Sequence, residues 1–365
     1  MRLCRTTVAG TATAFFLFDV SDAIDLAHVR TLIETAAPAQ LTKVAASHIQ
    51  YQQPPVVIDG SSLAASSVDG FRCRIKAFDY GVVSVALLRP IPDTWPALIS
   101  EGRALHDSAA AATTAERVCR AFLDRVAPAV ASPRATFLSE DYVVFTLTEV
   151  SGNPDTEKLI ARHGQEIAQL LRAEQAALST QEREEVLRHR ISYLANDLVV
   201  PTWNGAFIYD TETGSQGTIE LLEFANSQLL QFRYYDQLLD TELGRIYAQL
   251  QAHGWGRPWS GRRRYTRAAH HVHSLFIDVN ELTDKTENAL KIAGDVYFAR
   301  VFAMAAARLG LDQWKANVRE KLQTLDDIYR FAVEQTSMAR GELLELAIVA
   351  ILVLELVLFF AGIMK

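Results

Sequence analysis

The residue types best suited to binding chemistry lie in one short basic segment. Residues 261–267 read Gly-Arg-Arg-Arg-Tyr-Thr-Arg, and Trp255, Trp259 and Tyr265 lie beside or within it. The arginines are Arg262, Arg263, Arg264 and Arg267. Guanidinium groups clustered beside aromatic rings can bind phosphate groups or lipid headgroups, or stack on RNA bases. The alternative is a solvated loop that pairs with the acidic remainder of the chain.

A long apolar run occupies the C-terminal end of the sequence, at residues 343–363. About 20 apolar residues cover the roughly 30 Å hydrocarbon core of a bilayer, so the run predicts one transmembrane helix. Arg319, Lys321, Arg330 and Arg340 precede the run, and only Lys365 follows it. The positive-inside rule then predicts a tail-anchored, single-pass protein of the inner membrane, with its large domain in the cytoplasm.

Glu355 lies near the middle of this run, where a carboxylate is costly in lipid. One interpretation is a contact between helices of an oligomer. A second is a protonated acid that a strongly apolar helix tolerates. A third is that the run forms a buried core helix of a hairpin.

The sequence contains no established catalytic signature. A GxGxxG after a strand, a P-loop, an HExxH and a GxSxG are all absent from it. We therefore predict no catalytic residue, cofactor or metal ligand. The net charge of -7 over 365 residues argues against a general nucleic-acid coat. The three cysteines, Cys4, Cys73 and Cys119, form no CxxC pair, which is typical of a reducing compartment.

Mixed strands and helices in residues 1–215 predict an α+β head domain. The expected strands are 12–18, 56–58, a hairpin over 73–88 that turns at Asp79 to Gly81, 142–150 and a strand-like piece at 203–209. The expected helices are 95–105, 109–126, 156–171 and a segment from Ser179 to about 195, which begins with a capping pattern.

Residues 216–342 have the pattern of long helices. Apolar positions recur at steps of three and four from Leu222 to Leu250, from Leu275 to Ala307 and from Val318 to Leu343. Asp236 is a polar exception in the first seam. Such seams are typical of coiled-coil neighbours. We predict an antiparallel long-helix stalk, with a tight turn near Gly310, that leads into the transmembrane helix.

The C-terminal half resembles a known family. It begins with Leu222-Glu-Phe-Ala-Asn-Ser-Gln-Leu-Leu-Gln-Phe-Arg233 and ends with Gly341-Glu-Leu-Leu-Glu-Leu followed by an aliphatic run and Glu. This arrangement resembles the RMD1/RMND1/Sif2 (DUF155) family, and residues 78–83, Phe-Asp-Tyr-Gly-Val-Val, are similar to its early strand-turn-strand piece. The resemblance implies a bacterial member that is membrane-associated and acts as a scaffold.

The sequence as a whole predicts a membrane-anchored, non-enzymatic scaffold or tethering protein. It would form homo-oligomers through its helices and bind an unidentified cytoplasmic protein partner. Two alternatives stay open. One is an enzyme that acts on a membrane-linked or nucleotide substrate in the head domain. The other is a ribosome or RNA tether that binds through residues 262–267.

Overall fold

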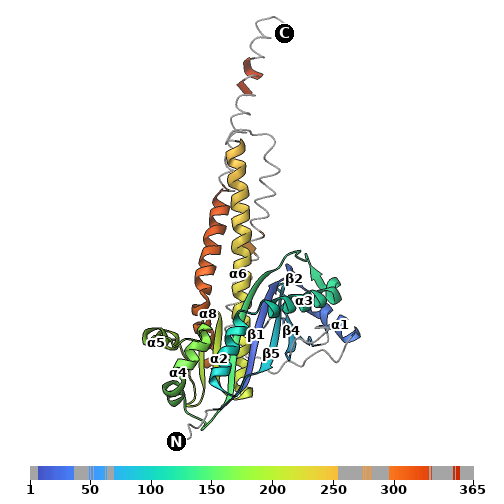
Figure 1. Cartoon of the computed structure of the whole chain (residues 1–365). Coiled ribbons are helices and arrows are strands. Elements are labelled where there is room, and N and C mark those ends of the chain that lie inside the picture. Colours follow the sequence, from blue (N-terminus) through green and yellow to red (C-terminus); the bar gives the residue numbers. More distant parts are fainter. Residues whose placement is uncertain are drawn as a thin grey trace, which may run out of the picture. The chain divides into compact units, whose positions relative to one another are not determined.

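The computed structural model describes most of the N-terminal two thirds of the chain and parts of the remainder (Figure 1). The described residues are 7–36, 49, 51, 53–61, 63, 70–253, 274, 276–277, 279–280, 296–328, 330, 348–349 and 351–353. The contacts divide the chain into two compact units. The first unit comprises Met1–Tyr234 and Asp284–Trp314, and the second comprises Tyr235–Thr283 and Lys315–Lys365.

The first unit is built on a seven-stranded mixed sheet with the order β3-β4-β5-β1-β7-β9-β8. Its strands are β1 (Val8–Asp19), β3 (Val56–Asp59), β4 (Arg72–Ala77), β5 (Val82–Pro90), β7 (Leu138–Val150), β8 (Leu198–Pro201) and β9 (Gly205–Tyr209). Strands β7 and β9 are parallel, and the other neighbours are antiparallel. A second small sheet pairs β2 (Ala23–Ile24) with β6 (Val130–Ala131). The predicted α+β domain is confirmed.

Helices cover one face of this sheet, with α5 packed against α4, and Figure 1 shows α2 and α3 in front of the sheet. They are α1 (Leu26–Ala36), α2 (Trp95–His106), α3 (Ala109–Val126), α4 (Thr156–Arg172) and α5 (Thr180–Arg188), with a 3-10 turn, η2, at Ala127–Ala129. The side chain of Ser179 accepts a hydrogen bond from the backbone of Glu182, so the predicted cap of α5 is confirmed. Helix α5 is shorter than predicted, and β8 follows where the sequence indicated no strand.

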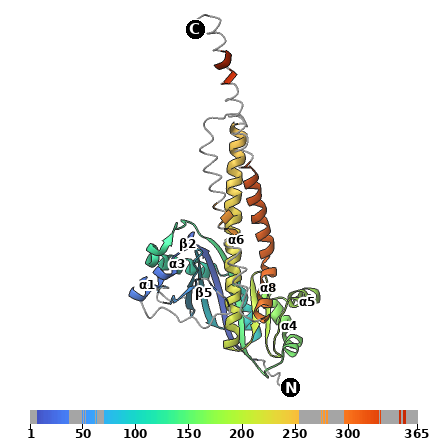
Figure 2. The ribbon, with the colours of Figure 1, turned by 180° about the vertical axis from the view of Figure 1, so that it is seen from behind.

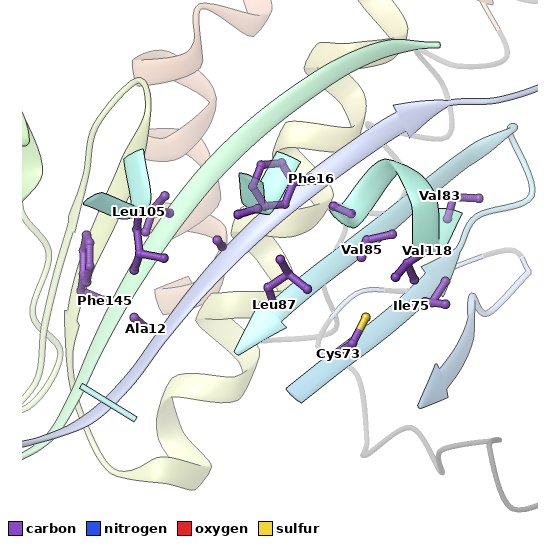
Figure 3. Close-up of a cluster of buried hydrophobic side chains, with 14 of the residues drawn as sticks. Ala12, Phe16, Cys73, Ile75, Val83, Val85, Leu87, Leu105, Val118 and Phe145 are labelled. Carbon is purple, nitrogen blue, oxygen red and sulfur yellow. The ribbon is translucent and has the colours of Figure 1, made fainter. Parts of the chain in front are cut away.

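The core between these helices and the sheet is apolar (Figure 3). Every second residue of a strand points to the same face, so Ala12 and Phe16 of β1 lie with Cys73 and Ile75 of β4 on the helix side. Cys73 and Cys119 are both buried and free. Burial raises the pKa of the Cys73 thiol to about 12, so this cysteine behaves as a small apolar side chain.

Helix α6 (Glu212–His253) covers the opposite face of the sheet with its first part, as Figure 2 shows from behind. Strand β1 is therefore buried on both faces from Ala12 onward, which explains its largely apolar sequence. The seam predicted from Leu222 onward is buried in this region, including Ala225, Leu229 and Phe232.

In the second unit, the later part of α6 packs against residues 315–328, which belong to a helical segment that begins at residue 311. Leu239 and Ile246 of α6 are buried, as are Val318, Leu322 and Leu325. Asp236, the polar residue in the predicted seam, forms an ion pair there. Lys321 Nζ lies 2.7 Å from Asp236 Oδ1 and 2.6 Å from Asp240 Oδ1. The predicted seams are confirmed over these residues.

The seam predicted along α8 (Val296–Leu309) is wrong. Val296, Arg300, Ala303 and Ala307 are exposed, whereas the opposite face is buried. The buried residues are Tyr297, Phe298, Val301, Phe302, Ala305 and Leu309. Alanine is small enough for either face, so the aromatic side chains decide which face is buried. Helix α8 ends at Leu309, and Gly310 takes a left-handed φ of 67° as expected of a break near this glycine.

The predicted transmembrane helix over residues 343–363 needs correction. Among the described residues, no helix is long and apolar enough to cross a membrane. The expectations of a tail anchor, a membrane contact and a single-pass inner-membrane location are corrected with it.

Candidate functional site

Charged and polar side chains lie buried or half-buried between α6 and the second face of the sheet. We call this group the α6 polar layer, and its members are Asp19, Arg74, Lys76, Tyr80, Arg134, Glu223, Ser227 and Gln231. Arg74 and Lys76 alternate with Cys73, Ile75 and Ala77 along β4, so they point away from the apolar core. Glu223, Ser227 and Gln231 recur every four residues, so one face of α6 presents all three to the sheet.

An ion-paired cluster lies at the centre of this layer. Lys76 Nζ is 2.5 Å from Glu223 Oε2, and both side chains are buried. Arg74 Nη2 lies 3.8 Å from the same oxygen. Burial alone would raise the pKa of Glu223, but the charges of Lys76 and Arg74 outweigh burial and lower this pKa. Glu223 is therefore a carboxylate that is held between two cations.

A second cluster surrounds Asp19, at the end of β1. Arg134 Nε lies 2.5 Å from Asp19 Oδ2, and Gln231 Nε2 donates to Asp19 Oδ1 at 3.0 Å. Arg134 Nη1 also lies 2.9 Å from Asp22 Oδ1, and its guanidinium group lies 3.9 Å from the ring centroid of Tyr234. Burial raises the pKa of Asp19 to about 6, although the charge of Arg134 opposes this shift. Asp19 therefore titrates near neutral pH.

We expect Asp19 to make stability depend on pH. Its folded pKa of about 6 exceeds the unfolded value of 3.8, so the folded chain retains a proton that the unfolded chain has released. The stabilisation is fully present below about pH 4 and is lost as the pH rises through about 6, which amounts to about 3 kcal/mol. Urea unfolding at several pH values measures it. The stability of the wild type relative to Asp19→Asn should fall across this interval, and a constant difference would contradict the assignment.

Tyrosines complete the layer and stay neutral. Tyr80 Oη lies 2.6 Å from Ser227 Oγ, and the Tyr80 ring stacks on Phe78. Tyr51 packs edge-on against Phe224 of α6. Burial raises the pKa of both tyrosines well above 10, so each keeps its phenolic proton. The arrangement holds α6 in one register on the sheet, because ion pairs and hydrogen bonds restrict position more than apolar contacts do.

The residues that the sequence nominated for binding lie elsewhere. Arg262, Arg263, Arg264, Arg267 and Glu355 all lie outside the described residues. Their roles in phosphate, RNA or lipid binding and in helix contacts stay predictions. The α6 polar layer was missed, although one signal was present: Glu223 and Gln231 interrupt an apolar helix, and Arg74 and Lys76 interrupt an apolar strand.

Comparison with known proteins gives one family and one relative. The family described as "Uncharacterized protein MJ0711, N-terminal domain" matches residues 9–216. The "Uncharacterized protein MJ0711" of Methanocaldococcus jannaschii is 25% identical over 224 residues, which cover 61% of this chain and 67% of that protein. No solved structure matches the chain. The resemblance to the RMD1/RMND1/Sif2 family stays a prediction.

Proposed function

Since the chain belongs to the MJ0711 N-terminal domain family, whose description names no activity, we propose from the fold that the protein is a non-enzymatic scaffold. In this proposal the second unit associates with that of another copy, and the first unit holds a protein partner. The observation that carries the proposal is the exposure of large apolar side chains in both units. Aromatic side chains in such positions are enriched at the energetic centres of protein interfaces.

In the first unit, Trp203 is 64% exposed, although hydrogen bonds fix the backbone of the turn that carries it. This turn joins β8 to β9, and Thr202 N–H donates to Gly205 O at 2.7 Å. Tyr142 Oη also donates to Thr202 O at 3.2 Å from the neighbouring strand β7. A fixed backbone lets an exposed indole bind a partner with little loss of conformational entropy. Trp203 is therefore the side chain to which we assign partner binding.

In the second unit, the exposed apolar side chains include Tyr247, Phe276 and Ile277. Tyr247 is 51% exposed, one position from the buried seam residue Ile246 of α6. Burying an aromatic side chain against a second copy would contribute to association at roughly 25 cal/mol per Å² of apolar surface removed from water. These residues support self-association through helices.

The α6 polar layer supports the same proposal in another way. Its carboxylates are engaged by cations from other elements, as Glu223 is by Lys76 and Asp19 is by Arg134. The Lys76–Glu223 pair joins β4 to α6, and Gln231 of α6 also donates to Asp19 of β1. A helix that is fixed on the sheet in this way suits a scaffold.

Affinity capture with the full-length chain tests the partner. We expect Trp203→Ser to lose proteins that the wild type retains from an extract of its native host, because the exposed indole supplies the contact. Glu184→Ser is the matched control, since Glu184 is exposed on α5 and the substitution removes no apolar surface. Identical sets of captured proteins for Trp203→Ser and the wild type would contradict partner binding at this turn.

A further inference from the structure

The loop before β8 displays two large apolar side chains on a rigid backbone. Tyr193 is 70% exposed and Leu194 is 59% exposed. Yet their backbone N–H groups both donate to the buried carboxylate of Asp197, at 2.6 and 3.0 Å. Ser192 Oγ lies 2.9 Å from the same carboxylate. Exposed apolar residues that are held this firmly are prepared for contact with another surface.

The start of helix α4 fixes this loop from the other side. The backbone N–H of Thr156 donates to Ala195 O at 2.7 Å, and Thr156 Oγ1 donates to Asp197 O at 2.7 Å. The ring of Tyr193 also lies 5.4 Å from that of Tyr297 in α8, next to the exposed Val296. Helices α4 and α8 of the first unit therefore both contact the loop.

A cavity of about 420 Å³ opens beside the two apolar side chains. Ser192, Ala195 and Leu198 line it from the loop and β8. Ser192 directly precedes Tyr193 in the chain, and Ala195 directly follows Leu194. Asp155, Thr156 and Glu157 line it from the start of α4, and Arg190 completes it. The same surface thus carries both the exposed pair Tyr193 and Leu194 and the cavity beside it.

The charges of this surface also complement one another. Glu157 and Arg190 are both exposed at the cavity. Asp155, the third charged residue of the lining, lies 2.5 Å from Lys158 Nζ. A surface whose exposed charges all had the same sign would repel a second copy of itself. Here the positive Arg190 of one copy can face the negative Glu157 of another. In a two-fold contact each such pair occurs twice.

We propose that this surface is a two-fold contact between two copies of the chain. Tyr193 and Leu194 of each copy enter the cavity of the other, and Arg190 pairs with Glu157 across the interface. The proposal rests on the self-association in the proposed function and adds a second contact, in the first unit, to the one between helices.

Isotope-mixed crosslinking of the full-length chain tests this contact. Arg190→Lys keeps the positive charge and supplies an amine, which a carbodiimide joins to the Glu157 carboxylate only at direct contact. Unlabelled and ¹⁵N-labelled Arg190→Lys chains are mixed before reaction. We expect crosslinked 157–190 peptides that combine one labelled and one unlabelled arm. Glu157→Gln in the same chain is the control, and it should abolish this crosslink.

A second pair of variants separates this contact from the helical one. We expect Tyr193→Ser with Leu194→Ser to lower the yield of mixed crosslink about tenfold or more, because the apolar pair supplies most of the contact energy. Tyr247→Asp, in the second unit, should leave the crosslink in place. Crosslinks found only within one copy, or a yield insensitive to Tyr193 and Leu194, would overturn the proposal even if the helices still associate. A wild-type chain that gives the crosslink, but whose self-association is unchanged by Tyr247→Asp, would instead count against the proposed helical association alone.

Discussion

Replacing Lys76 by methionine lowers the free energy of unfolding by about 3–5 kcal/mol, because it leaves Glu223 buried beneath α6 without its nearest cation. Arg74 Nη2, at 3.8 Å from Glu223 Oε2, compensates only in part, since a third of the Arg74 side chain is exposed. Urea unfolding at neutral pH, followed by circular dichroism, measures the loss.

The double variant Lys76→Met with Glu223→Met is the control for lost packing. It removes both charges together, so it should recover most of the stability that the single variant loses. If Lys76→Met alone lowers the free energy of unfolding by less than about 1 kcal/mol, Glu223 is not held as a buried carboxylate. The ion pair that we describe between β4 and α6 would then be wrong.

Replacing Gly10 by alanine destabilises the first unit by about 3 kcal/mol, because the sheet has no room for a side chain at this position. A Cβ at Gly10 would overlap the carbonyl oxygen of Thr146 and lie 2.9 Å from Leu147 Cα, both in the backbone of β7. Strands β1 and β7 would have to separate where their register shifts between Ala9 and Gly10. Thermal and urea unfolding report the change.

Gly244 provides a matched control for that substitution. It lies within α6, and an added Cβ there meets no atom within 4 Å. Gly244→Ala should therefore stabilise the chain by about 0.5–1 kcal/mol, since alanine favours helix over glycine. If Gly10→Ala and Gly244→Ala change the free energy of unfolding equally, the close approach of β1 and β7 at Gly10 is wrong.

Local patterns in the sequence predicted much of the first unit. The hairpin over 73–88 is present as β4 and β5, and its turn ends at Gly81 with a left-handed φ of 80°. The buried seam of α6 was also predicted, because a period near 3.6 depends only on residues close in the chain.

The candidate site depends on contacts that no local pattern encodes. Gln231 bonds Asp19 across 212 positions of sequence, and Tyr80 meets Ser227 across 147. Seen alone, Asp19 ends an apolar strand and Glu223 interrupts an apolar helix, which is equally typical of solvated positions. The docking of α6 on the second face of the sheet brings Glu223 beside Lys76 and Gln231 beside Asp19, and the segment before β7 brings Arg134 to Asp19.

Sedimentation equilibrium of the full-length chain tests the central claim, self-association as a scaffold, most directly. We predict a particle heavier than the 40.5 kDa of one chain at micromolar concentration. Tyr247→Asp should weaken this association, because it places a charge where an exposed aromatic side chain of the second unit would be buried. A wild-type chain that sediments as a single 40.5 kDa species throughout the concentration range would contradict the scaffold.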